Sequence, residues 1–86
     1  MPNIKQQEKR VRVASRERLE NLRYRSTVKT LAKRLEAAVA AGDKDQVAAE
    51  HGALVRMLDR AAARGALHRN TAARRKAQAA RLVSGA

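Results

Sequence analysis

Residues 65–76, with the sequence GALHRNTAARRK, carry the side chains whose types and spacing best suit binding chemistry. The hydrogen-bond donors and cations of this segment are His68, Arg69, Asn70, Arg74, Arg75 and Lys76. Gly65 can take the left-handed conformation that ends a helix, and Asn70 can cap the helix that follows. The sequence therefore predicts a rigid corner that presents donors and positive charge to an anionic partner.

No arrangement typical of a catalytic or metal site accompanies this segment. The chain has no cysteine, which excludes disulfides and thiol chemistry. His51 and His68 lie far apart in the sequence without a carboxylate cluster beside them, so no metal site is expected. We expect His51 to be a half-buried packing residue. There is no glycine-rich phosphate loop and no nucleophile–base pair, so we predict no enzyme activity, no cofactor and no small-molecule substrate.

The distribution of charge points to a polyanionic partner. The chain of 86 residues has 20 Lys and Arg against 8 Asp and Glu, a net charge of +12. Residues 1–34 hold eleven basic and three acidic residues, residues 35–59 hold two and five, and residues 60–86 hold seven and none. Two cationic regions thus flank an acidic middle, which favours one polyanion contacted at both ends.

Large apolar side chains are few. Of the hydrophobic residues, 19 are Ala, with seven Val, eight Leu and one Ile, and the only aromatic residue is Tyr24. Such a composition borders on that of disordered chains, so we expect the basic regions to fold poorly until a partner neutralises them. No apolar run approaches the roughly 18 residues of a membrane span, and no signal-peptide pattern is present. We expect a cytoplasmic protein.

The chain is predicted to form one domain, residues 1–86, with helices at about 4–41, 44–64 and 71–83. Asn3 and Gln6 form a plausible capping pair at the first helix, which neither Pro nor Gly then interrupts. Gly42 is expected to end that helix, with Asp43 capping the second and the Gln46 side chain returning a capping bond. So short a connection makes the two helices antiparallel.

Apolar residues at helical spacing predict the core of an all-α three-helix bundle. The expected core residues are Val28, Leu31, Leu35, Val47, Leu54 and Leu58. In the third helix, Ala73, Ala77 and Ala80 are expected to form a small-residue packing face. The first half of helix 4–41 carries a cationic stripe instead, formed by Lys5, Lys9, Arg12, Arg16 and Arg23. We therefore expect a long, partly projecting first helix.

The kind of polyanion is left open by composition. Tyr24 alone cannot form the stacking platform that single-stranded nucleic acids need. A-form RNA is recognised through its shape and backbone, which suits a long cationic helix, but a nucleoid-type DNA-binding protein would have the same composition. A membrane-active cationic helix would need an exposed apolar face with aromatic anchors, which the first helix lacks.

A resemblance decides between RNA and DNA. The segments that carry it are Met1-Pro2-Asn3-Ile4-Lys5, Lys9-Arg10-Val11, Ala40-Ala41-Gly42-Asp43-Lys44, Leu58-Asp59-Arg60-Ala61-Ala62 and Gly65-x-x-His68-Arg69-Asn70-x-Ala72-Ala73-Arg74-Arg75-Lys76. Together they resemble the bacterial small-subunit ribosomal protein S20 family over essentially the whole chain. The resemblance implies a three-helix bundle in the small ribosomal subunit. It also implies direct binding of 16S ribosomal RNA, at the 5′ domain and the long penultimate helix, early in assembly.

The candidate RNA-binding residues combine the cationic stripe, the corner and the positions that the resemblance adds. They are Lys5, Lys9, Arg10, Arg12, Arg16, Arg23, Arg64, His68, Arg69, Asn70, Arg74, Arg75 and Lys76. Their expected role is to neutralise phosphates and so bridge RNA helices that would otherwise repel one another.

Overall fold

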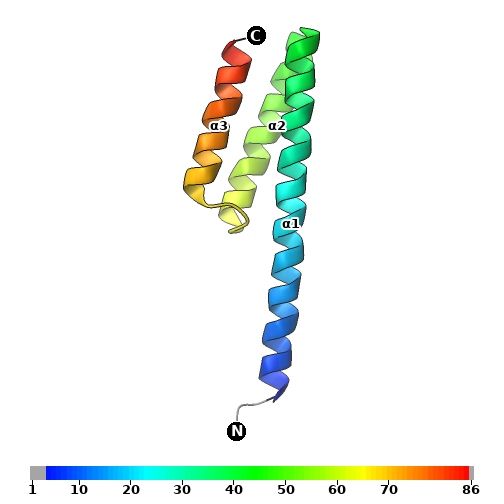
Figure 1. Cartoon of the computed structure of the whole chain (residues 1–86), viewed down its shortest axis with the longest axis vertical. Helices are drawn as coiled ribbons and strands as arrows, with labels where there is room; N and C mark the ends of the chain where they lie inside the picture. Colours follow the sequence, from blue (N-terminus) through cyan, green and yellow to red (C-terminus); the bar gives the residue numbers. More distant parts are fainter. Residues whose placement is uncertain (1–3, 86) are drawn as a thin grey trace.

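The computed structural model describes residues 4–85, which form three α-helices joined by two short connections (Figure 1). The helices are α1 (Ile4–Ala41), α2 (Lys44–Ala63) and α3 (Arg69–Ser84). From the end of α1 the chain turns back, so that α2 lies along the second half of α1, and α3 reverses direction again beside α2. The predicted all-α, three-helix fold is confirmed.

Half of α1 projects beyond the bundle, as the sequence predicted. Its 38 residues contain neither Gly nor Pro, and at about 1.5 Å per residue they extend over nearly 60 Å. Every residue from 4 to 20 is exposed, and Figure 1 shows this half standing alone. The radius of gyration is 17.2 Å, against about 12 Å for a compact chain of this length. The molecule is a small bundle with a long arm.

The connection between α1 and α2 is closed by backbone hydrogen bonds. Gly42 has a φ of +73°, a conformation that side chains with a Cβ rarely adopt. Its N–H donates to the Val39 carbonyl at 3.1 Å, and the Asp43 N–H donates to the Ala38 carbonyl at 3.4 Å. This pair of bonds is the Schellman motif, so Gly42 ends α1 as expected.

Asp43 caps α2, but the reciprocal half of the expected capping box does not form. The Asp43 side chain accepts a hydrogen bond from the Gln46 backbone N–H at 3.2 Å. The Gln46 side chain donates instead to Glu50 Oε1 at 2.7 Å, one turn further along α2. The reason is that the Asp43 N–H, which Gln46 would have bound, is already used to close α1.

The core lies where the second half of α1 packs against α2 and α3. Five of the six predicted core residues are buried, namely Val28, Leu35, Val47, Leu54 and Leu58, and the sixth, Leu31, packs partly buried against them. His51 is half-buried, as expected. Within residues 4–85 no polar or charged side chain is buried, so the core itself is entirely apolar.

The expected packing face of α3 is wrong. Ala73, Ala77 and Ala80 are exposed, whereas Ala72 and Ala79 are buried. Leu82 and Val83, the large apolar residues of α3, share the face of these two alanines and pack against the core. Burying large side chains removes more apolar surface from water than burying alanines, so they set the rotation of the helix.

Because Leu58 is 0% exposed, its truncation should remove much of the stability of so small a core. Leu58→Ala is expected to lower the free energy of unfolding by about 2–5 kcal/mol. Leu19→Ala is the matched control, since Leu19 is 54% exposed on the projecting half of α1, and it should cost less than about 0.5 kcal/mol. Urea denaturation followed by circular dichroism measures both, and similar losses for the two variants would contradict this core.

Candidate nucleic-acid interface

The corner between α2 and α3 is built as a rigid turn. Gly65 has a φ of +77°, and its N–H donates to the Ala62 carbonyl at 3.1 Å. The Ala66 N–H donates to the Ala61 carbonyl at 2.8 Å, and both of these alanines are buried. The turn is thus a second Schellman motif, with an apolar residue at each of the two positions that commonly pack together in it. Gly65 ends α2 as the sequence predicted.

His68, and not Asn70, caps α3. The Nδ1 atom of His68 accepts a hydrogen bond from the Asn70 backbone N–H at 3.1 Å, and α3 begins at Arg69, two residues earlier than expected. A histidine ring nitrogen reaches the same backbone donor as an asparagine oxygen, although histidine is not among the usual capping residues. With Nδ1 accepting, the neutral ring carries its proton on Nε2, which is available as a donor at this exposed corner.

A side chain of α1 ties the corner to the bundle. Arg25 donates from Nε to the Ala66 carbonyl at 3.1 Å, a hydrogen bond that spans 41 residues of sequence. Leu67, next in the chain, packs partly buried against the core. The donors of the corner are therefore presented by a segment held from both its ends and from α1.

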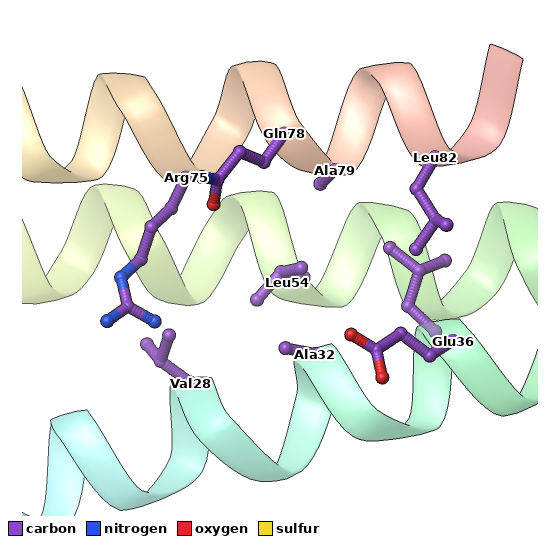
Figure 2. Close-up of a pocket in the computed structure, with 9 residues that line it drawn as sticks. Val28, Ala32, Glu36, Leu54, Arg75, Gln78, Ala79 and Leu82 are labelled. Carbon is purple, nitrogen blue, oxygen red and sulfur yellow. The ribbon is translucent and has the colours of Figure 1, made fainter. Parts of the chain in front are cut away.

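The three consecutive cations of α3, Arg74, Arg75 and Lys76, do not form one patch. Successive residues of a helix lie about 100° apart around its axis, so the three side chains leave α3 in different directions. Lys76 forms an ion pair with Asp59 of α2, with Nζ 2.7 Å from the carboxylate oxygen. Arg75 extends toward Val28 of α1 (Figure 2), and both Arg74 and Arg75 are exposed. Of the three, Lys76 is already partly neutralised within the protein.

A shallow groove of about 310 Å³ runs between α1 and α3 (Figure 2). Its floor is apolar and includes Leu54 of α2, while Glu36, Arg75 and Gln78 supply the polar groups. These are a single carboxylate, a guanidinium and an amide, with no histidine or hydroxyl among the lining residues. The groove offers no nucleophile–base pair.

The cationic stripe of α1 lies entirely in solvent. Lys5, Lys9, Arg12, Arg16 and Arg23 are all exposed, and they extend over about 27 Å of helix. Glu8 approaches Arg12 at 3.8 Å, but both side chains are largely exposed, so this ion pair neutralises little. Arg10 lies off the stripe, because five residues turn the helix well past its starting face.

One residue of the stripe and one residue of the corner line the same hollow. Arg23 and Arg64 line one hollow of about 270 Å³, together with Glu20 and Tyr24. Arg23 thereby joins the upper end of the stripe to the start of the corner. The structure thus brings the candidate residues into two groups, one on the projecting arm and one around the corner, with Arg23 and Arg64 between them.

Sequence reasoning missed two cations. Arg25 and Lys29 of α1 line a hollow with Arg75 of α3. Their spacing of four residues places them on one side of α1, but nothing local in the sequence pairs that side with a residue 46 positions later. Only the packing of α3 beside α1 brings Arg25 and Lys29 together with Arg75.

The described part of the chain, residues 4–85, holds no group of three or more potential metal ligands. Among its helices none has the length and apolar character needed to cross a membrane.

Comparison with known proteins identifies the family. The sequence matches the model of the family described as ribosomal protein S20 over residues 2–84. The chain belongs to the ribosomal protein S20 family. A relative from Heliobacterium modesticaldum, named small ribosomal subunit protein bS20, is 47% identical over 91% of this chain and 89% of its own length. Proteins of the same name from Kocuria rhizophila and Acaryochloris marina are 43% and 42% identical, over 98% and 100% of this chain and 98% and 99% of their own lengths.

If His68 is the cap of α3, its replacement should weaken the S20-family corner before any RNA is present. His68→Ala is expected to lower the free energy of unfolding by about 0.5–2 kcal/mol, whereas His68→Asn, which restores a capping acceptor, should recover most of that loss. Urea denaturation of the free protein measures both variants. Asn70→Ala serves as the control and should change little, and a larger loss for Asn70→Ala than for His68→Ala would overturn the assignment.

Proposed function

We propose that this protein is a structural constituent of the small ribosomal subunit. In this role it binds 16S ribosomal RNA directly and bridges RNA helices by neutralising their phosphates during assembly. Support comes from its membership of the S20 family and from relatives that match it over nearly their whole lengths. No cofactor, metal or catalytic step is part of this role.

The observation that carries the proposal is the projecting half of α1. Residues 4–20 are exposed on every side, so this segment contributes nothing to the core of its own protein. One face of it carries the cations Lys5, Lys9, Arg12 and Arg16. An isolated helix that exposes like charges along one face is disfavoured in water, and a row of phosphates would remove that penalty.

The corner supplies a second surface. Arg64, His68, Arg69, Asn70, Arg74 and Arg75 all gather around the α2–α3 turn or the first turns of α3. The core and the Schellman turns fix the direction of this surface relative to the arm. Because the molecule is 63 Å long, the two surfaces can contact separate RNA helices, for which we propose the 5′ domain and the long penultimate helix of 16S RNA.

The mode of binding that fits these surfaces is recognition of the A-form backbone. Tyr24, the only aromatic residue of the chain, is half-buried between α1 and α2, so no row of stacking side chains is available for single-stranded bases. Exposed Arg and Lys side chains can bind phosphate oxygens of the RNA backbone without reading the bases.

A nucleoid-type DNA-binding role is the alternative, because a net charge of +12 attracts any nucleic acid. A competition experiment separates the two roles. Protein bound to a labelled 16S 5′-domain fragment is challenged with unlabelled duplex DNA or with unlabelled fragment at equal phosphate concentration. The RNA should compete at least about tenfold better, and equal competition would contradict the ribosomal proposal.

The arm should contribute to the salt dependence of RNA binding. Replacing Lys9 and Arg16 together by Gln is expected to weaken binding to 16S RNA and to lower the slope of log K against log salt by about two, one for each phosphate that is no longer neutralised. Both residues are exposed, so the bundle itself should be unaffected.

The matched control removes two cations from the acidic segment. Lys44→Gln with Arg56→Gln changes the net charge by the same amount on α2, where we propose no RNA contact. This control should leave the slope within about 0.5 of wild type. Equal slopes for the two double variants would mean that only total charge matters, and that the arm is not a defined binding surface.

A further inference from the structure

A second cationic site lies at the seam between α1 and α3, on a side of α1 away from its stripe. It is a hollow of about 360 Å³, lined by Leu22, Arg25 and Lys29 of α1, by Arg75 of α3 and by Leu67 of the corner. Arg25 and Lys29 are one helical turn apart, and Arg75 faces them from the other helix. Three cations from two helices thus surround one hollow.

Nothing in the hollow neutralises these charges. None of its described lining residues is acidic. Asp59, the carboxylate closest in sequence to the start of α3, is bound to Lys76. Glu36 shares the neighbouring apolar groove with Arg75 but does not line this hollow, and it lies seven residues beyond Lys29, about 10 Å along α1. The like charges of Arg25 and Lys29 therefore repel each other along α1, and both repel Arg75 across the seam.

The hollow has the geometry and surroundings of an oxyanion site. Arg25 uses Nε for its bond to the Ala66 carbonyl, which fixes the position of its guanidinium while its two Nη groups offer further donors. Leu22, Leu67 and Val28 supply the apolar part of the lining beside these cations. At about 30 Å³ per water molecule, the volume accommodates a phosphate with part of its hydration shell.

Filling this site would change how α3 is held. α3 packs mainly on α2, and its contact with α1 is the weakest between any two helices of the bundle. The seam is flanked by Arg75, which also extends over the Val28 end of the apolar groove (Figure 2). An anion bound between Arg75 and the cations of α1 would attract both helices. It would therefore replace the repulsion between α1 and α3 by an ion-mediated contact.

We infer that Arg25, Lys29 and Arg75 form a binding site for a single phosphate group, and that the bound phosphate fastens α3 to α1. This inference rests on the proposed function in one respect, namely that a backbone phosphate of RNA is the occupant. The ligand chemistry itself is that of any phosphate oxyanion. The site adds Arg25 and Lys29 to the binding residues and couples RNA contact to the rigidity of the bundle.

Inorganic phosphate tests the site without RNA. The thermal unfolding midpoint of the full-length free protein is measured by circular dichroism in sodium phosphate and in sodium chloride of equal ionic strength. Phosphate should raise the midpoint above its value in chloride by several degrees. The double variant Lys29→Gln/Arg75→Gln should lose at least half of that increment. Lys44→Gln/Arg56→Gln, which removes the same charge from exposed positions of α2 outside the hollow, should keep it.

Equal phosphate increments in the wild type and in both double variants would overturn the site, because general charge screening would then explain the effect. If Arg75→Gln prevents folding, Lys29→Gln alone decides the question, since Lys29 is exposed and its replacement should remove a measurable part of the increment.

A second arm of the experiment identifies the source of the phosphate. In binding to 16S RNA, Lys29→Gln/Arg75→Gln should lower the salt slope by about two relative to Lys44→Gln/Arg56→Gln, one for each cation that no longer meets a phosphate. Loss of the phosphate increment with an unchanged RNA slope would overturn the assignment to an RNA phosphate. Whether the wild-type protein binds 16S RNA at all is a separate measurement, so failure of the ribosomal role and failure of this site remain distinguishable.

Discussion

Repulsion among positive charges is the constraint on which the rest of this structure depends. A net charge of +12 is carried by 86 residues whose core consists of a few Leu and Val side chains and small alanines. Burial of so small a core stabilises the fold only modestly, so like-charge repulsion can destabilise it appreciably. The fold limits the repulsion by distance, because half of α1 projects away from the bundle. It also places α2, which carries most of the acids of residues 35–59, between α1 and α3.

Local backbone chemistry fixes where the remaining charges lie. Both connections are Schellman turns closed by a glycine, and the side chains of Asp43 and His68 cap the helices that follow. Arg25 then fastens the second turn to α1. Turns of this kind leave little freedom in the directions of the packed helices, so the cations of the corner are presented at fixed positions on the bundle. The preformed corner therefore loses little conformational entropy when it binds RNA, whereas the arm is ordered by the RNA that it contacts.

Regular features of the structure could be predicted from the sequence, and those set by long-range contacts could not. Spacing of apolar residues placed Val28, Leu35 and Leu58 in the core, and Gly42 marked the end of α1. The face of α3 was misassigned because alanines recur at helical spacing on several faces, and only packing against α2 decides between them. The expected Asn3–Gln6 cap includes a residue outside the described range.

In the candidate site too, features that depend on contacts between helices could not be predicted from the sequence. His68 was taken for a binding residue alone because histidine is an uncommon cap. Lys76 was expected to be free for RNA, yet its partner Asp59 comes from another helix. The cluster around Arg75 was missed for the same reason, since its cations come from helices far apart in the sequence.

The central claim, that a polyphosphate stabilises the parts of the protein its own core does not, can be tested most directly by amide hydrogen exchange. Exchange would be measured residue by residue for the free protein and for the protein bound to 16S RNA at the same low salt. We expect residues 4–22 to exchange nearly as fast as an unfolded chain in the free protein and to become strongly protected in the complex. Core amides such as those of Leu54 and Leu58 should be protected in both. Equal protection of the arm with and without RNA would contradict it.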